Sequence, residues 1–430
     1  MSHRPLVRGG VTLAVAATML LLAGCGTPPA PREAPTPRAT AQPSPTTSPT
    51  APATPRPTAA ARIPAGTQLT DISFVSPTLG FALGENCVAA PTCRAVVVAT
   101  TDGGTSWTAS SAPPAAVGST AVTTTPSEPV ATVGRLTFAN PLDGWAWGPG
   151  LYATSNGAVS WAKVAAAGPV LGLTVVGGEV WAVEADCGGA TGGACPLVLE
   201  TAPISGGTWS PLAGVPAVDA MSASLAATAG GDAWLEAAVP AGAGSGTSLL
   251  LDATGDGGAT WAARTVPCPL APPGTTDPLA AYGSATLWIG CVSEPGAGSQ
   301  SKAIYTSADG GASWSLAGSS GPAAAGVPAA LGRVPIAGYL EQLVLNGPQV
   351  GWMALARGTL MVSRDGGRTW SPAISAQAVA AGSGVVRLSL AGSSAFAIAD
   401  GVTLPTGSPA SAAVYRSTDA GASWSAVPLG

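Results

Sequence analysis

The sequence has few of the residues on which common catalytic and nucleic-acid-binding sites depend. It contains one histidine, His3, and only 9% of its 430 residues are charged. A nucleic-acid-binding surface needs clustered lysine and arginine, and this sequence has no such cluster. Its mean hydropathy is positive, at +0.36, but beyond the N-terminus glycine, serine, proline or aspartate soon interrupts every apolar stretch. This pattern indicates neither a multispanning membrane protein nor a nucleic-acid binder.

The N-terminal residues have the features of an export signal. Arg4 and Arg8 precede an apolar run over 11–22, which is shorter than a membrane-spanning helix requires. The run ends in Leu22-Ala23-Gly24-Cys25, which resembles the bacterial lipobox. The resemblance implies a signal peptide over 1–24 and a lipid on Cys25. It also implies export and attachment to the outer side of the bacterial cytoplasmic membrane. An ordinary signal peptide with an unrelated cysteine is the alternative.

Cleavage at this position would remove the only histidine. A mature chain without histidine cannot use Ser-His-Asp or Cys-His catalysis, and it cannot form a histidine-containing zinc site. We therefore expect no metal and no cofactor.

Residues 25–61 are predicted to be the lipidated cysteine followed by a disordered linker. Residues 26–60 hold 11 of the 41 prolines, with threonine, alanine and serine between them. Such a composition favours extended polyproline geometry and cannot bury a core. At roughly 3.1 Å per residue, the linker could hold a domain about 100 Å from its anchor.

The remaining chain, 62–430, is a sevenfold repeat marked by tryptophan. The marking residues recur every 48 to 56 positions: Trp107, Trp161, Trp209, Trp261, Trp314, Trp370 and Trp424. Five of them end a motif of the form Ser/Thr-x-Asp-x-Gly-x-Ser/Thr-Trp, whose aspartates are Asp102, Asp256, Asp309, Asp365 and Asp419. The copy before Trp161 has Asn156 in place of aspartate, and the copy before Trp209 keeps little of the motif.

The motif resembles the Asp-box (BNR) repeat of β-propellers. Asp-Gly-Gly between two β-type segments predicts a hairpin turn, because glycine readily adopts positive φ. The carboxylate can accept backbone N–H bonds within the turn, and the tryptophan can bury its ring between sheets. We therefore interpret these aspartates and tryptophans as structural and not as catalytic residues.

A second aromatic residue precedes each motif and is predicted to lie in the core. These residues are Phe81, Trp145, Trp181, Trp234, Trp288, Trp352 and Phe396, so the two series use 12 of the 13 tryptophans. Each repeat is consistent with four strands, which we call A to D. Seven such repeats predict an all-β fold, a seven-bladed β-propeller of four-stranded antiparallel blades. The repeats run from strand A to strand D, and the sequence shows no strand exchange between the first and the last.

The linked pattern of a Phe/Leu strand, a Gly-aromatic strand and an Asp-Gly-Gly turn resembles the photosystem II assembly and stability factor propellers and their bacterial relatives. Members of that family are seven-bladed binding proteins, and some are lipoproteins. The resemblance implies the fold and a binding role for residues 66–430, without a photosynthetic client.

Six cysteines remain after Cys25, an even number that suits an oxidising compartment. Fifteen pairings are conceivable, but the repeat map favours Cys87–Cys93, Cys187–Cys195 and Cys268–Cys291. All three pairs would lie on the face that carries the B–C loops and the D-to-A connections, which we call the looped face. A metal site at these cysteines is the alternative, and no CxxC pair supports it.

Charge points to the same face. From residue 66 onward there are 11 Lys and Arg against 21 Asp and Glu, a net charge of −10. The charged residues just beyond the second strands are Glu85, Glu184, Asp186, Glu236, Arg357 and Asp400. These six residues are the candidate binding face, an acidic surface that could attract a basic partner. The alternative is that they merely solvate the ends of loops.

Two functions follow from these patterns. The first is a monomeric, non-catalytic propeller that binds an unidentified protein or glycan and acts as an interaction or assembly scaffold. The second is a sialidase-like or other carbohydrate-active glycosidase, or a glycan-binding protein. Asp boxes are frequent in sialidases, and Arg62-Ile63-Pro64 resembles their Arg-Ile-Pro motif. The sequence shows no recognisable arrangement of the arginines, tyrosine and carboxyls that such catalysis needs.

Overall fold

The described residues form seven β-sheets and no helix in this computed structural model. The structure describes residues 63–87, 93–117, 132–188, 193–241, 247–268, 276–321, 328–357, 359–374, 385–399, 403–404 and 414–427. All of them belong to the second of two units into which the chain divides, Met1–Arg56 and Pro57–Gly430. The expected signal peptide, Cys25, most of the linker and Asp400 lie outside the described residues. Within the described part of the chain, no helix could cross a membrane.

Each sheet contains one blade of a β-propeller, four antiparallel strands in chain order, and two of the sheets gain further short strands. The strands of blades 1 to 4, from the innermost outward, are β1 (Thr67–Phe74), β2 (Gly80–Asn86), β3 (Arg94–Thr100), β4 (Thr108–Ser110); β7 (Arg135–Phe138), β8 (Asp143–Trp147), β9 (Leu151–Ser155), β10 (Ala162–Lys163); β11 (Val170–Val176), β12 (Glu179–Ala185), β13 (Cys195–Pro203), β14 (Ser210–Pro211); β16 (Ser222–Ala227), β17 (Ala233–Pro240), β18 (Thr247–Thr254), β19 (Ala262–Arg264).

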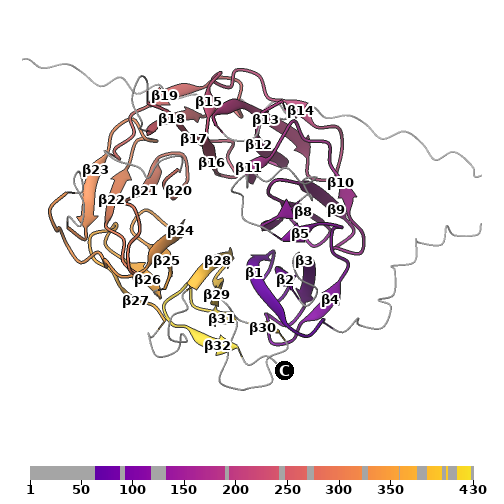
Figure 1. The fold of residues 1–430 in the computed structure, drawn as a ribbon. Coiled ribbons are helices and arrows are strands. Elements are labelled where there is room, and N and C mark those ends of the chain that lie inside the picture. The colour runs from indigo at the N-terminus through magenta and orange to yellow at the C-terminus, as the bar shows by residue number, and fades with distance from the viewer. Residues whose placement is uncertain are drawn as a thin grey trace, which may run out of the picture. The chain divides into compact units, whose positions relative to one another are not determined.

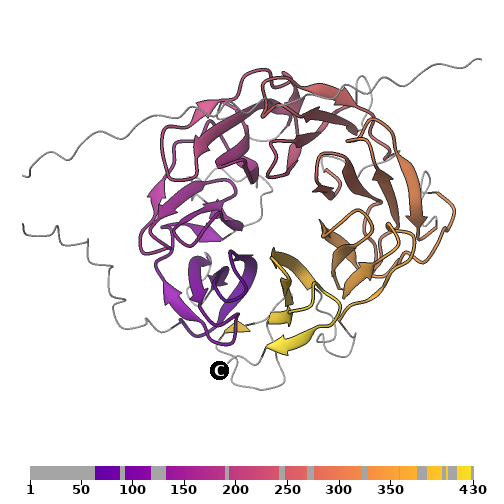
Figure 2. The same ribbon diagram turned by 180° about the vertical axis from the view of Figure 1, so that it is seen from behind.

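The strands of blades 5 to 7, in the same order, are β20 (Leu279–Tyr282), β21 (Thr286–Val292), β22 (Lys302–Ser307), β23 (Ser315–Ser319); β24 (Tyr339–Leu345), β25 (Gly351–Ala356), β26 (Leu360–Ser363), β27 (Ser371–Pro372); β28 (Val385–Ala391), β29 (Ser394–Ala399), β31 (Val414–Ser417), β32 (Ser425–Val427). Figures 1 and 2 show the blades arranged in a ring, with the first strand of each blade nearest the centre. The predicted seven-bladed architecture is confirmed.

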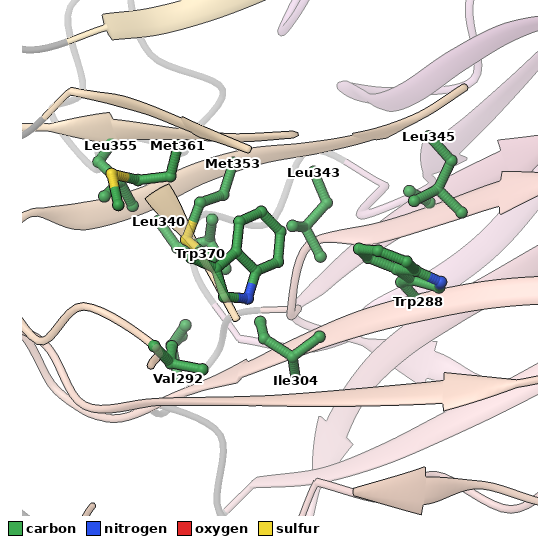
Figure 3. Packing of buried hydrophobic residues seen from close by; sticks show 12 residues of the cluster. Trp288, Val292, Ile304, Leu340, Leu343, Leu345, Met353, Leu355, Met361 and Trp370 are labelled. Carbon is green, nitrogen blue, oxygen red and sulfur yellow. The ribbon is translucent and has the colours of Figure 1, made fainter. Parts of the chain in front are cut away.

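The core lies between neighbouring blades. The second strand of each blade is almost wholly buried because sheets cover both of its faces, and Trp181, Trp234, Trp288 and Trp352 are no more than 2% exposed. Between blades 5 and 6, Trp288 and Ile304 pack against Leu343 and Met353 of the next blade, beside Trp370 (Figure 3). The many apolar residues of the sequence therefore pack between neighbouring sheets. The second series of aromatic residues lies in this core, as predicted.

The Asp-box turns close each hairpin with the same hydrogen bonds. In the fifth blade, Ser307 Oγ donates to Asp309 Oδ1 at 2.7 Å and accepts the Gly311 N–H at 2.8 Å, while the Ser313 N–H donates to Asp309 Oδ1 at 2.9 Å. The motifs around Asp102, Asp256, Asp365 and Asp419 repeat this arrangement. The carboxylate thus accepts a backbone N–H bond within the turn, as expected, and the first hydroxyl of the motif bridges the carboxylate and a glycine N–H.

The Asn156 copy is intact in structure although it is degraded in sequence. Asn156 Oδ1 accepts the Ser160 N–H at 2.9 Å, and Asn156 Nδ2 donates to Ser160 Oγ at 2.8 Å. In the other boxes the corresponding serine or threonine hydroxyl donates to the carboxylate instead. Asparagine thus preserves the turn by reversing one hydrogen bond.

The ring closes by packing blade 1 against blade 7. Leu69 and Ile72 of β1 share one core cluster with Ile398 and Val414 of blade 7. The Phe74 N–H donates to Ser389 Oγ of β28 at 2.9 Å. The short strand β30 (Thr403–Leu404), which follows β29, pairs with the beginning of β1. Both blades keep four strands from their own repeat, so closure depends on side-chain packing and this added strand.

Candidate functional site

The looped face is the more elaborate of the two faces of the propeller. It carries the disulfides Cys87–Cys93, Cys187–Cys195 and Cys268–Cys291, which are the three expected pairs. It also carries short strands that add to the blade sheets at their looped ends: β5 (Ala116–Val117), β6 (Thr132–Val133), β15 (Asp219–Ala220) and β30. The loops of this face are therefore tied to the blades.

The opposite face is built from repeated short turns. In every blade a backbone N–H of the box turn, or of the corresponding turn in blade 3, donates to a carbonyl of the turn between the first two strands. Examples are Gly103 N–H to Thr78 at 2.9 Å and Ile204 N–H to Gly178 at 3.2 Å. Sequence differences between blades thus concentrate on the looped face.

The predicted binding residues divide into surface and interior groups. Asp186 and Arg357 are exposed, and Glu85 at the end of β2 is partly exposed. Glu184 and Glu236 are fully buried, and Asp400 lies outside the described residues. The two interior carboxyls cannot add accessible charge to the looped face, so little of the expected acidic surface comes from these six residues.

Burial changes the ionisation of the interior carboxyls. Desolvation raises the pKa of Glu184 to about 7, although its carboxylate accepts the Ala167 N–H. Desolvation also raises the pKa of Glu236 well above its usual value, and the neighbouring Asp277 adds to the rise. Desolvation raises the pKa of Asp277 to about 7. The sequence analysis did not single out Asp277, because a lone aspartate at the end of a connection carries no local signal of burial.

The box aspartates have the opposite character. Hydrogen bonds, above all from the Thr260 and Ser313 side chains, lower the pKa of Asp256 and of Asp309 to about 2. Such carboxylates stay ionised and already accept hydrogen bonds, so they are poor general acids or bases at neutral pH. This geometry agrees with their structural interpretation.

The looped ends of blades 5 and 6 are joined around a buried lysine. Lys302 Nζ donates to the Gly338 carbonyl at 2.7 Å and to that of Gln300 at 2.8 Å, and it also lies within 3.4 Å of three further carbonyls. Burial lowers the pKa of Lys302 to about 7. On the adjoining surface, Arg357 lies over the ring of Tyr339 at 5.7 Å, and Ile336 is 43% exposed. A cation, an aromatic ring and an exposed aliphatic side chain thus lie near backbone that the Lys302 ammonium holds by hydrogen bonds.

Opposite charges line the inner strands near the closure of the ring. Arg387 Nε of blade 7 lies 3.6 Å from Asp71 Oδ1 of blade 1, and Arg387 also approaches Glu341 of blade 6 at 3.8 Å. Burial lowers the pKa of the nearby Arg135 to about 10, and the charge of Arg387 adds to this effect. The sequence analysis missed this cluster because its members come from four separate repeats.

A surface pocket of about 340 Å³ lies along the outer edge of blade 4, where β18 extends beyond the short β19. Leu250, Asp252, Arg264 and Cys268 contribute to its wall. Burial raises the pKa of Asp252, and the charge of Arg264 counteracts that rise. The pocket combines one carboxyl, one guanidinium and apolar side chains, and no pattern in the sequence indicated it.

Among the residues that the structure describes, two groups of donor atoms are close enough to hold a metal ion. Within each group, the atoms of Glu85, Cys87 and Cys93, or of Cys268, Asp277 and Cys291, lie within 4.8 Å of one another. The cysteines of both groups form disulfides, so their sulfurs are not the thiolates that bind zinc. Only the carboxyl oxygens remain as metal ligands.

The fold and the repeated turn define an Asp-box β-propeller. The BNR/Asp-box repeat model matches residues 361–372, which include the turn around Asp365. No curated protein matches the chain in sequence.

Solved structures similar to this chain include two of YCF48 and one of a GH74 enzyme. YCF48 bound to a D1 peptide has 17% identity and a TM-score of 0.48, covering 79% of this chain and 93% of that one. YCF48 from Cyanidioschyzon merolae has 13% identity and a TM-score of 0.47, covering 79% and 94%. The Niastella koreensis GH74 enzyme has 11% identity and a TM-score of 0.30, covering 83% and 71%.

Proposed function

We propose that this protein is an exported, lipid-anchored and non-catalytic propeller that binds a protein partner on its looped face. In this role it acts as a scaffold for the assembly of an exported or membrane-bound complex. The observation that carries the proposal is that the three disulfides and the four added strands of the described residues reinforce the looped face. Loops that are held in place before binding lose less conformational entropy when a partner docks.

The chemistry of the carboxyls supports a non-catalytic role. Glycoside hydrolysis uses two carboxyls that flank the scissile bond. In this protein Glu184, Glu236 and Asp277 are at most 1% exposed and cannot reach a substrate. The pocket on blade 4 has Asp252 as its one lining carboxyl, beside Arg264.

The surface beside Lys302 is where we expect the partner to contact the protein. Arg357, Tyr339 and Ile336 present a guanidinium, an aromatic ring and an exposed aliphatic side chain together, and arginine and tyrosine are enriched at binding hot spots. The carbonyl cage of Lys302 fixes the backbone at Ile336 and Gly338. This surface therefore needs little rearrangement on binding.

Crosslinking in native membranes tests the binding proposal. The full-length protein and the variant Ile336→Ser/Arg357→Ala are crosslinked, purified and compared by mass spectrometry. The matched control is Leu142→Ser/Val159→Ser, which changes two aliphatic residues that are 56% and 60% exposed on the opposite face. We expect one partner to be lost with the looped-face variant and kept with the control.

Equal recovery with both variants, or hydrolysis of sialyl or xyloglucan substrates by the purified protein, would contradict this function. The anchor is tested separately with Cys25→Ser, which should move the protein from the membrane fraction to the soluble fraction, because the lipid provides the membrane affinity.

A further inference from the structure

The looped end of blade 4 leaves open a sheet edge that blades 1 and 3 cover. In blade 3, β13 pairs with the outer strand β14 and, at its looped end, with the added strand β15. In blade 1, β4 and β5 cover β3 in the same way. In blade 4, β19 pairs only with residues 251–253 of β18, and no strand of the described chain pairs with the outer side of residues 248–250.

The connection that follows β19 is held on blade 5 and does not return along β18. The Thr265 carbonyl accepts the Trp314 Nε1 proton of blade 5 at 2.7 Å, and Cys268 is bonded to Cys291 of β21. In blades 1 and 3, the corresponding connection turns back and supplies the added strand. The pocket of about 340 Å³ on blade 4 therefore lies beside the open part of β18 and has residues 248–250 in its wall.

The open part of β18 has the properties of a strand that accepts a partner. Successive residues of an antiparallel strand direct their backbone N–H and C=O groups to opposite neighbours, so at least one of the three residues offers both groups outward. Exposed edges are usually protected by charge, proline or a covering segment. Ser248, Leu249 and Leu250 include neither charge nor proline, and Leu250 is 37% exposed. Such an edge can bind an extended peptide as a further strand.

A carboxyl next to this edge indicates the charge of the peptide. Leu250 and Asp252 are two positions apart in β18 and therefore stand on the same face of the blade. Asp252 is opposite Ala263, whereas Arg264 is opposite Leu251 and stands on the other face. A lysine or arginine opposite Leu250 can lay its aliphatic stem on that leucine and bring its charge to Asp252, past the small side chain of Ala263.

We propose that residues 248–250 of β18 bind an extended, basic peptide segment of another protein as an added antiparallel strand, with a lysine or arginine of that segment against Asp252. The two-residue strands β5 and β15 show that blades 1 and 3 accept such an addition at the same position. The net charge of −10 from residue 66 onward favours a basic segment over an acidic one. The site lies on blade 4, apart from the surface beside Lys302, and does not rest on the function proposed for that surface.

Peptide binding to the purified full-length protein tests this proposal. The probe is a blocked, fluorescently labelled peptide of alternating valine and threonine with a central lysine, and a matched peptide has glutamate in place of the lysine. Fluorescence anisotropy gives the affinity for the wild type, for Asp252→Asn and for the control Asp219→Asn, which removes an exposed carboxylate from β15 on blade 3. Hydrogen exchange with and without the lysine peptide reports where the peptide lies.

We expect the lysine peptide to bind the wild type and Asp219→Asn equally, and Asp252→Asn about fivefold more weakly. The glutamate peptide should bind the wild type more weakly than the lysine peptide by about fivefold or more. At saturating lysine peptide, exchange of the outward amide among residues 248–250 should slow by about tenfold or more, because a ladder hydrogen bond protects it. Exchange of residues 94–96 should not change, because β5 already covers that edge.

Three results would overturn the proposal. The first is no binding of the lysine peptide, or binding without slower exchange at residues 248–250. The second is equal affinity of the two peptides for the wild type, or of the wild type and Asp252→Asn for the lysine peptide. The third is exchange at residues 248–250 that is as slow without peptide as at residues 94–96. Such slow exchange would assign the edge to the same chain if it is independent of protein concentration, and to a second copy if it grows with concentration.

The test is independent of the function proposed for the surface beside Lys302. The variant Ile336→Ser/Arg357→Ala changes that surface and leaves blade 4 intact, so it should bind the lysine peptide as the wild type does. Loss of lysine-peptide binding in this variant would show that the peptide lies on the other surface, and would also contradict the assignment to β18.

Discussion

The ring of Phe74 in blade 1 lies flat against the ring of Phe396 in blade 7, with centroids 3.5 Å apart and an interplanar angle of 3°. Phe81 of blade 1 and Phe138 of blade 2 stack in the same way at 3.7 Å. The junction that closes the ring is therefore packed like a junction between consecutive blades.

This equivalence predicts that Phe396→Ala and Phe81→Ala have similar costs. Both side chains are at most 2% exposed, and removal of a buried phenylalanine typically costs about 3–5 kcal/mol. Chemical denaturation monitored by tryptophan fluorescence provides the measurement, with the exposed Leu142→Ala as control. A much smaller effect for Phe396→Ala would show that the ring is open between blades 7 and 1.

The box turns should be more sensitive to their first hydroxyl than to their last. Thr254→Val leaves the buried Gly258 N–H without its acceptor and should cost about 1–3 kcal/mol. Thr260→Val in the same turn removes only an exposed hydroxyl donor to Asp256, so its cost should stay within about 0.5 kcal/mol. Equal costs in urea denaturation would contradict this assignment.

The box aspartates should make the propeller sensitive to acid. Hydrogen bonds lower the pKa of Asp309 to about 2 in the folded protein. Its stabilising contribution is therefore present above its ordinary pKa of about 4 and lost as the pH falls toward 2. Asp309→Asn should keep the turn, as Asn156 does, without this titration. The difference in Tm between the wild type and the variant should shrink between pH 4 and pH 2, and a constant difference would be evidence against it.

Glu184 should destabilise the protein as the pH rises toward neutrality. Burial raises its pKa to about 7, from an ordinary value of 4.5, and the charge of Glu200 contributes. Between these values the unfolded chain releases a proton that the folded chain retains, so stability falls with rising pH. Glu184→Gln removes this difference in bound protons, which is at most about one proton between the folded and the unfolded chain. The stability of the variant should therefore fall less steeply with rising pH than that of the wild type. Parallel stability profiles of the two proteins from pH 4.5 to 7 would show that Glu184 does not titrate in this way.

Lys302 should be essential for the looped ends of blades 5 and 6. Lys302→Met keeps most of the side-chain volume but leaves the carbonyls of Gln300 and Gly338 without their donor. Loss of a buried polar network of this kind should cost about 3 kcal/mol. Lys163 is exposed in β10, so Lys163→Met is the matched control with an effect within about 0.5 kcal/mol. Hydrogen exchange at Gly338 should rise only in the Lys302 variant.

The sequence was most informative where structure depends on local chemistry. Asp309, Gly310 and Gly311 define a turn by themselves, and its repetition before regularly spaced tryptophans predicted the blades. The disulfide pairs followed from the same map, because Cys87 and Cys93 share one loop and Cys187 and Cys195 share another. The sequence analysis treated the Asn156 copy as a degraded motif, although the turn is intact. An amide can donate the hydrogen bond that a carboxylate would accept, and the motif does not reveal this.

Side-chain burial was beyond the sequence analysis. Glu184 and Glu236 occupy positions near strand ends that suggested a surface, yet the neighbouring segments cover both. The ion pair of Arg387 with Asp71 joins residues from different repeats. No local pattern encodes such contacts.

By itself, the sequence determined the all-β class, the number of blades and the chemistry of the turns, because each depends on residues only a few positions apart. Only the tertiary structure decided how blade 7 meets blade 1, which carboxyls are buried and which charges face one another. The reason is that desolvation and charge pairing depend on the atoms that surround a side chain, and in a propeller most of those atoms belong to the next blade.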